Sequence, residues 1–206
     1  MIGTVALPVL DPGESPRERA DAARNRARIL EAAELLVGER GIEHVSMDDV
    51  ARAAAVGTGT LYRRFGDRAG LALALLDERT RIFQDQLISG PPPLGPGAPA
   101  ADRLRAFGEG YLVLLEHHAG LLLAAVPHGT VGRGTHSLWV THLSILLREA
   151  APHLDPQFTA EALLATLAPA HHQRVRIGLE WPVERLREGW RGLVNAICAP
   201  PGGGCA

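Results

Sequence analysis

The spacing of apolar residues along the chain predicts helices over most of its length. From about residue 18 to 39, Ile29, Ala33, Leu36 and Val37 recur at helical intervals and form one apolar stripe. Comparable stripes predict further helices over 68–88, 102–118, 137–150, 157–175 and 183–198, and the very apolar segment 120–126 predicts a short one. No segment of useful length alternates as a strand does. The pattern therefore predicts an all-α fold of about nine helices.

Glycine and proline divide this pattern into an N-terminal and a C-terminal part. Gly41 is expected to end the first helix, Gly66 precedes the helix that starts near residue 68, and Pro169 is expected to kink the helix over 157–175. The segment SGPPPLGPGAPA predicts a loop. We expect four regions: a disordered arm over 1–16, a first domain over 17–66, a second domain over 67–199 and a disordered tail over 200–206.

The segment 46–65, SMDDVARAAAVGTGTLYRRF, predicts two short helices joined by a tight turn. Ser46 is a good N-cap for the first of them, and Asp49 follows three residues later, as in an acidic variant of the capping box. Gly57 marks the turn. The expected buried face of the first short helix consists of Val50, Ala53 and Ala54.

The second short helix, over 58–65, is predicted to expose residues suited to a DNA groove. Leu61 and Phe65 are four residues apart and face inward as a pair. The opposite face then carries hydroxyl and guanidinium groups near the start of the helix, the part that enters the major groove in helix-turn-helix proteins. These groups belong to Thr58, Thr60, Tyr62, Arg63 and Arg64.

Composition limits the other possibilities. The formal net charge is −2, which argues against bulk electrostatic binding to nucleic acid but leaves room for a local basic patch. Only two cysteines are present, so a disulfide framework is not expected and a cytoplasmic protein is. No run reaches the roughly 18 apolar residues that span a membrane, and the first residues make a poor signal peptide.

The N-terminal part resembles the tetracycline-repressor (TetR) family of bacterial transcription regulators. The resemblance covers about residues 24–75, and a weaker one extends over 168–178. The matching positions are RILEAA from Arg28, Gly41, Ser46, DVA from Asp49, VGTGTLYRRF from Val56, Asp67-Arg68 and Leu71. Two positions depart from the family: Ala55 stands where glycine is usual, and Gly57 stands where serine is usual. Alanine in a turn with positive φ costs about 1 kcal/mol, whereas glycine is an acceptable N-cap.

The resemblance implies a homodimeric repressor of double-stranded DNA. The operator would be a palindrome with half-sites about 34–36 Å apart. Thr58 and Thr60 would enter the groove, and Tyr62, Ser46 and Arg28 would contact phosphates. Whether Arg63 reads a guanine or a phosphate stays open. The full set of predicted DNA contacts is Arg28, Ser46, Thr58, Gly59, Thr60, Tyr62, Arg63, Arg64 and Arg68.

The resemblance also implies a small-molecule effector, apolar or amphipathic, and a dimer through the last two helices. The expected pocket residues are Phe107, Tyr111, Leu114, Leu122, Trp139, His142 and His172. The expected interface residues are Leu163, Leu167, Leu186, Trp190, Leu193 and Ile197. Plain packing remains an equal alternative for any single pocket residue, and Trp190, Leu193 and Ile197 could instead face the core of their own chain.

Neither a metal site nor a cofactor is expected. The histidine pairs at 117–118 and 171–172 are adjacent, so their side chains project about 100° apart on a helix and cannot chelate one ion. The chain also lacks paired-carboxylate spacing, a nucleophile elbow and a phosphate loop, which argues against an enzyme. Two alternatives stay open: a DNA-binding or interaction protein without an effector, and a helical enzyme with a vestigial DNA-binding unit.

Overall fold

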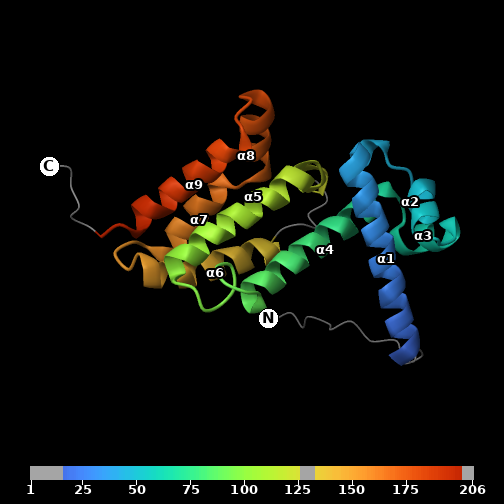
Figure 1. Ribbon diagram of the computed structural model, residues 1–206, viewed down its shortest axis with the longest axis horizontal. Coiled ribbons are helices and arrows are strands. Elements are labelled where there is room, and N and C mark those ends of the chain that lie inside the picture. The colour runs from blue at the N-terminus through green and yellow to red at the C-terminus, as the bar shows by residue number, and fades with distance from the viewer. Residues whose placement is uncertain (1–15, 126–132, 201–206) are drawn as a thin grey trace, which may run out of the picture. The chain divides into compact units, whose positions relative to one another are not determined.

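The computed structural model of the chain describes residues 16–125 and 133–200 (Figure 1). The predicted disordered arm and tail therefore lie almost wholly outside the described residues. Every regular element within 16–125 and 133–200 is helical, which confirms the predicted all-α class. The chain forms two compact units, residues 1–71 and 72–206, and each is described separately below.

The first unit is a small group of helices around one apolar core. Its elements are α1 (Pro16–Arg40), the 3₁₀ turn η1 (Ile42–His44), α2 (Met47–Ala53) and α3 (Thr58–Phe65). Ile29 and Ala33 on α1, Val50 on α2 and Leu61 on α3 are completely buried. They form a shared core in which α1 packs on α2 and α2 packs on α3. Leu61 therefore anchors α3 in the core that α1 and α2 also form.

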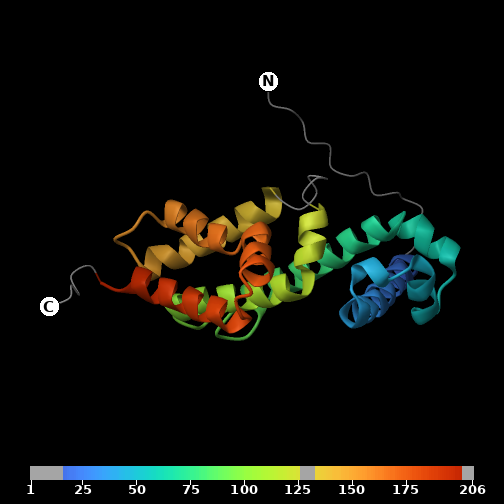
Figure 2. The same ribbon diagram turned by 90° about the horizontal axis from the view of Figure 1, so that it is seen from above.

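Helix α4 (Arg68–Ser89) begins at the end of the first unit and continues into the second. The remaining helices of the second unit form two layers on α5, with α6 and α7 paired and α9 lying along α5 (Figures 1 and 2). They are α5 (Ala100–Ala125), α6 (Arg133–Ala150), α7 (Pro156–Thr166), α8 (Pro169–Gln173), the π-helical turn η3 (Arg174–Gly178) and α9 (Val183–Cys198).

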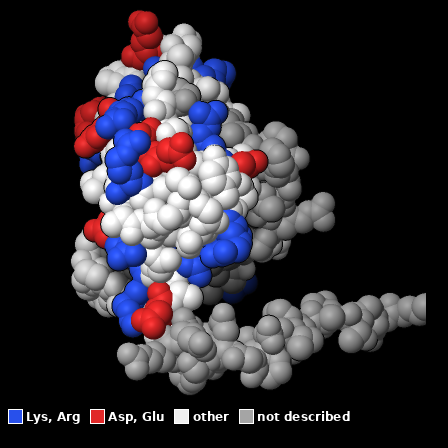
Figure 3. Space-filling model, turned by 90° about the vertical axis from the view of Figure 1, so that its right-hand side faces the viewer, with Lys and Arg blue, Asp and Glu red and all other residues white. Residues whose placement is uncertain are grey.

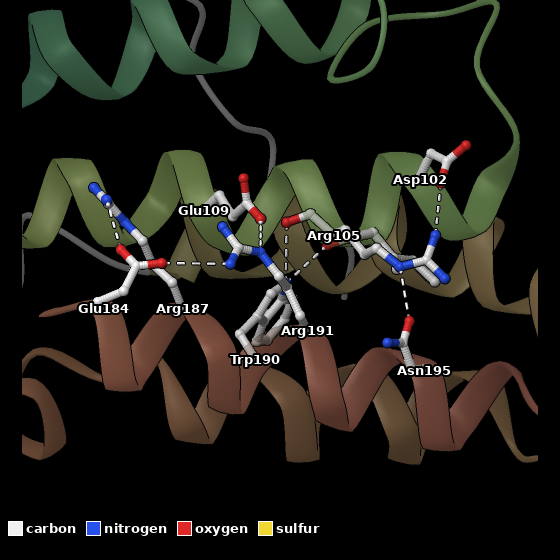
Figure 4. A network of polar contacts seen from close by, with 9 residues as sticks. Asp102, Arg105, Glu109, Glu184, Arg187, Trp190, Arg191 and Asn195 are labelled. Atoms are coloured by element: carbon white, nitrogen blue, oxygen red, sulfur yellow. Dashed lines mark hydrogen bonds and ion pairs between the residues drawn. The ribbon is translucent and has the colours of Figure 1, made fainter.

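Helices α5 and α9 of the second unit pack closely around Trp190. Trp190 is 3% exposed, and its indole N–H donates to the carbonyl oxygens of Leu104 at 3.1 Å and Arg105 at 3.2 Å. Its ring lies so close to Gly108 that a Cβ there would fall 1.9 Å from the indole. Around the ring, polar side chains of the two helices pair across the contact (Figure 4). Trp190 therefore fixes the register of α9 on α5.

Two predicted helix boundaries in the second unit are wrong. The helices expected over 102–118 and 120–126 are one helix, α5, which runs through Gly120. A single glycine costs a helix only about 1 kcal/mol relative to alanine, so it does not end one. The helix expected over 157–175 is instead interrupted between α7 and α8. Ala168 is extended (ψ 136°) because it precedes Pro169, which then opens α8.

Another prediction failed within α2. Ala53 was expected on the buried face, but it is exposed, and Ala51 is buried in its place. Met47, Val50, Ala51 and Ala54 share one side of the helix, and Ala53 lies roughly 110° around the axis from the middle of that side.

Candidate nucleic-acid interface

The first turn of α2 is closed by Ser46 and Asp49. Ser46 Oγ accepts the Asp49 N–H at 3.1 Å, and Asp49 Oδ2 accepts the Ser46 N–H at 3.3 Å and the Ser46 hydroxyl at 2.6 Å. The hydrogen bonds from the Ser46 side chain and then its backbone lower the pKa of Asp49. The predicted capping box is therefore confirmed. The hydroxyl proton of Ser46 already has an acceptor, so a phosphate could receive it only in exchange for Asp49.

The turn between α2 and α3 is a Schellman motif with alanine in its left-handed position. Val56 N–H donates to the Ala51 carbonyl at 2.9 Å, and Ala55 N–H donates to the Arg52 carbonyl at 3.2 Å. Ala55 has φ of 51°, so the positive φ expected at this residue is present. Both bonds of the motif are made, and the turn holds the end of α2 close to the start of α3 despite the cost at Ala55.

Helix α3 presents a polar face and buries one strong anchor. Leu61 is completely buried and Phe65 half-buried, as their spacing predicted. Gly57 is the N-cap, and no side chain closes the first turn. Thr60 is half-buried, and the exposed residues of this helix are Thr58, Gly59, Tyr62, Arg63 and Arg64. The hydroxyl groups of Thr58 and Tyr62 and the guanidinium of Arg63 thus lie on the exposed side of a helix that is anchored by Leu61.

The two neighbouring arginines of α3 differ in their contacts. Arg64 Nη1 donates to the carbonyl oxygen of Ala22 in α1 at 2.8 Å, so this guanidinium ties α3 to α1. Arg63 makes no such bond within the described part of the chain and is exposed. Arg63 is therefore available to a nucleic acid, whereas Arg64 acts first as a positioning residue. The sequence placed both arginines among the predicted DNA contacts, with the weaker claim for Arg64.

An open hollow of about 780 Å³ lies in the first unit between α1 and the start of α3. Two predicted contacts, Arg28 and Thr60, line it together with Gly57. Arg24 and Asn25 also line it, and neither was predicted. Asn25 Oδ1 accepts a hydrogen bond from Arg28 at 3.0 Å, and Arg24 pairs with Asp21. The i, i+4 spacing of Arg24 and Arg28 is the signal that could have found the additional residues.

Arg68 and Ser46 lie at helix starts rather than on α3. Arg68 is exposed in the first turn of α4, where Asp67 Oδ1 accepts the Gly70 N–H at 2.9 Å and caps the helix. Gly66 adopts φ of 77° just before this cap, as the predicted break requires. The predicted DNA residues thus come from α1, α3 and the first positions of α2 and α4.

Charge on this side of the molecule is mixed. Figure 3 looks onto the face on which α2 and α3 lie in Figure 1, and basic and acidic side chains alternate there around an uncharged area. All 21 basic residues of the chain are arginines, and Asp21, Asp49 and Asp67 offset some of them in the first unit. A surface of this kind favours contacts at particular positions over strong sequence-independent attraction to phosphates.

In the second unit, most of the predicted pocket residues pack on one another. Phe107, Tyr111, Trp139 and His142 form an aromatic cluster with Phe83, with ring centroids 5.5–6.2 Å apart for the pairs that touch. Burial, followed by the charge of Arg103, lowers the pKa of His142 to about 4. Leu114 is buried, whereas the structure does not describe the side chain of Leu122. This cluster is part of the core.

His172 lies away from the aromatic cluster and lines a separate pocket of about 270 Å³. The pocket is bounded by α5, the α7–α8 break and α9, and its other lining residues include Trp181 and Arg185, which were not predicted. A signal for it exists only in the folded chain, because its walls come from segments more than 50 residues apart.

The predicted interface residues are not equally accessible. Leu163, Leu167 and Trp190 are buried in the core of their own unit, and Leu186 and Ile197 are partly buried against it. Leu193, in contrast, is 44% exposed. On α7 the most exposed large apolar side chain is that of Phe158, at 72%.

The described segments contain neither a group of residues suited to bind a metal ion nor a helix suited to span a membrane. Within them, no three histidine, cysteine, aspartate or glutamate side chains group closely enough to hold an ion. None of the helices there combines the length and apolar character that crossing a bilayer demands.

Three comparisons with known proteins bear on this arrangement. The sequence profile of the bacterial regulatory proteins of the tetR family matches residues 29–75, which contain α2, α3 and the end of α1. An HTH-type transcriptional regulator of Staphylococcus aureus (strain USA300) is 42% identical over 65 residues, or 32% of this chain and 35% of that protein. The match therefore spans about a third of the length of this curated relative.

Solved structures match over nearly the whole chain. One is a Rhodococcus protein described as a TetR-family transcriptional regulator, with a TM-score of 0.62 and 25% identity over 86% of this chain and all of that one. Another is the multidrug binding protein EbrR complexed with imidazole, with a TM-score of 0.59 and 27% identity over 94% of this chain and all of that one.

The fold and the exposed face of α3 define a helix-turn-helix protein with a second all-α unit. Within that class, residues 29–75 match the profile of the tetR regulators, and the chain as a whole is similar to solved structures that include a TetR-family transcriptional regulator. The findings therefore point to a DNA-binding regulator of the TetR type.

Proposed function

We propose that this protein is a homodimeric transcription regulator that binds a palindromic operator through α3 and is released by a small molecule. The observation that carries the proposal is the exposed, rigidly anchored face of α3 within the region that matches the family profile. A regulator of bacterial genes of this kind would act in the cytoplasm.

The roles of individual residues follow from their exposure and contacts. Thr58 and Thr60 start α3 and would meet base edges, and Gly59 leaves room for the duplex to approach the backbone. Tyr62, which is 49% exposed, would bind a phosphate, and Arg63 would reach a guanine or a phosphate.

Residues outside the tip of α3 would complete the footprint. Arg28, whose guanidinium donates to Asn25 Oδ1, would contact a phosphate, as would Arg68. Ser46, the N-cap residue of α2, is the third residue proposed for a phosphate contact. Arg64 would act mainly by holding α3 against α1 through the Ala22 carbonyl. Loss of a phosphate contact should weaken binding to all sequences about equally, whereas loss of a base contact should change which sequence is preferred.

We propose that dimerisation uses the outer surface of α7 and α9. The exposed apolar residues Phe158 and Leu193 support this assignment, because a second copy could cover both. Among the originally predicted residues, Leu163, Leu167 and Trp190 would contribute by supporting these helices from inside, and Leu186 and Ile197 at the edge. Two-fold symmetry would present the two α3 helices to half-sites about 34–36 Å apart.

Release by an effector requires coupling between the second unit and α3. Helix α4 begins in the first unit and continues into the second. A ligand that shifts the position of α4 would therefore change the spacing between the two α3 helices of the dimer, which are the proposed DNA readers. A coupling of about 1–3 kcal/mol corresponds to a 5- to 150-fold change in operator affinity. EbrR, which was solved with imidazole, is a relative that holds a small molecule.

The second candidate is an interaction protein that binds no effector. The observation in its favour is the packed aromatic cluster, which fills the place where a large ligand cavity was predicted. An enzyme with a vestigial DNA-binding unit has no supporting observation.

Selection of bound sequences from a random DNA pool tests the main proposal. It should return a palindrome for the native protein, and a Thr58→Ala/Thr60→Ala variant should lose that preference. An unchanged preference in this variant would refute the assigned reader.

A further inference from the structure

The pocket lined by His172 has the dimensions of a site for a small molecule. Its volume is about 270 Å³, just below the sizes typical of sites for drug-sized ligands, roughly 300–1,000 Å³. Leu112, Leu167, Val175 and Trp190 supply apolar walls from α5, α7, η3 and α9. A compact, largely apolar molecule therefore fits this space better than an extended one.

His172 is the buried polar group of this pocket. It is 5% exposed, and its Nε2 lies 2.7 Å from Glu116 Oε1. Arg176 donates to both oxygens of the same carboxylate, from Nε at 2.7 Å and from Nη2 at 3.0 Å. Burial alone would raise the pKa of Glu116, but the hydrogen bonds from Arg176 and His172 outweigh it and lower the pKa. The carboxylate is consequently ionised at neutral pH and acts only as an acceptor.

This arrangement fixes the tautomer of a neutral His172. Because Glu116 only accepts, the proton of the ring must lie on Nε2, which leaves Nδ1 as an acceptor. Nδ1 is buried and has no hydrogen-bond partner among the described residues. A buried acceptor without a donor is unfavourable, and a ligand that brings an O–H group would satisfy it.

The charges of the lining residues argue against ionic ligands. None of the lining side chains is acidic, so a cation would find no counter-ion among them. The one arginine of the lining, Arg185, places its guanidinium carbon 3.9 Å from the centroid of the Trp181 ring, which already provides a partner for that charge. The Trp181 carbonyl in turn accepts a hydrogen bond from Arg176. Trp181 and Arg185 thus form one ordered wall of the pocket.

We propose that this pocket binds a small, uncharged, compact alcohol whose hydroxyl donates to His172 Nδ1. The inference rests on the proposed effector response and gives it a place and a ligand class. It also moves the effector site from the aromatic cluster of Phe107 and Trp139 to the space between α5, α8 and α9.

The test uses three molecules with the same six-membered ring: cyclohexanol, cyclohexanone and cyclohexanecarboxylate. Each is titrated into the full chain without DNA, by calorimetry and by the fluorescence of Trp181 and Trp190, which line the pocket. We expect cyclohexanol to bind roughly 5-fold more tightly than cyclohexanone, since only the alcohol can donate, and we expect the carboxylate to bind most weakly. Equal affinity of alcohol and ketone, or no binding of either, would overturn the proposal.

Two variants locate the binding. Gly189 lines the pocket from α9, and a Cβ there meets no atom within 4 Å, so Gly189→Leu can fill the space without disturbing the fold. We expect this variant to lose alcohol binding at least about 10-fold. His172→Phe should remove the preference for alcohol over ketone, whereas the control His171→Phe, at the neighbouring lining residue, should keep it. If His172→Phe does not fold, Gly189→Leu and the alcohol–ketone ratio still decide.

The outcomes separate this proposal from the proposed function. A protein that binds its selected operator but no alcohol refutes the pocket assignment alone. A protein that binds cyclohexanol but no specific DNA refutes the regulator and leaves the pocket. If no ring compound binds and Gly189→Leu changes the monomer–dimer equilibrium, a second copy fills the space and the proposal fails.

Discussion

Helix α3 and helix α9 divide their residues between packing and function in opposite ways. Of the residues of α3, only Leu61 is buried, and the side chains proposed to meet DNA lie on the solvent side. On α9, Trp190 is a core residue and also a wall of the pocket. Changes at an exposed residue of α3 such as Arg63 should therefore alter binding without altering stability, whereas changes at Trp190 should alter both the pocket and the stability of the second unit.

The largest expected effect is in the second unit. Trp190→Ala should destabilise that unit by about 3–5 kcal/mol, because it leaves a cavity beside Gly108 and removes the indole donor to two carbonyls. Thermal unfolding measures the loss. The control Ile145→Ala, at an exposed apolar residue of α6 outside the proposed interface, should change stability by less than about 0.5 kcal/mol. Similar losses in the two variants would show that Trp190 is not a core residue.

The second effect separates two adjacent residues of α3. Arg63→Ala should weaken operator binding by about 1–3 kcal/mol and leave thermal stability unchanged, because Arg63 is exposed. Arg64→Ala should lower the stability of the first unit as well, since it removes the bond to the Ala22 carbonyl. Fluorescence anisotropy with labelled DNA and thermal unfolding measure the two quantities. Identical behaviour of the two variants would contradict the division of roles.

The third effect depends on pH. His142 has a pKa of about 4 in the folded chain and near 6.5 in the unfolded one, so the unfolded state binds the proton first. Stability should therefore fall as pH decreases from about 6.5 to 4, by about 1–2 kcal/mol once partial solvent exposure is allowed for. His142→Phe should flatten urea-unfolding stability over this pH range. A native protein with no such dependence would show that His142 is not desolvated.

The smallest effect is a gain in the first unit. Ala55→Gly should stabilise it by about 1 kcal/mol, because Ala55 holds a φ of 51° that glycine adopts without a steric cost. Ala53→Gly, at an exposed helical residue two positions earlier, is the matched control and should destabilise by about 0.5–1 kcal/mol. Denaturant midpoints compare the two variants. Equal signs for both would argue against strain at Ala55.

Much of the first unit could be predicted because its signals are local. Ser46 with Asp49, Gly57 and Gly66 each specify a cap or a turn within a few residues, and the structure places a helix boundary at each. Leu61 and Phe65 turned inward, as their spacing requires. Ala53 was misplaced because alanine fits either face of a helix, so only packing decides which one is buried.

The second unit was less predictable because its decisive contacts are distant in sequence. Nothing near Gly120 indicates that α5 continues through it, and nothing near His172 indicates its pairing with Glu116, 56 residues away. The six residues proposed for the interface lie on apolar stripes, but a stripe does not tell which of its members face the same chain. Trp190 faces the core of its own chain because Gly108 on α5 leaves room for the indole.

Because no side chain caps α3 at Gly57, the first backbone amides of this helix can report on DNA binding through their hydrogen exchange. In the free protein the first amide groups of this helix have only water to bind, so their hydrogens should exchange with deuterium quickly. Once a duplex supplies phosphate oxygens in place of that water, the exchange of Thr58 and Gly59 should slow, while the amides of α2 beyond the Ser46 cap should change little. Mass spectrometry of these peptides would then register occupancy of the operator without any label.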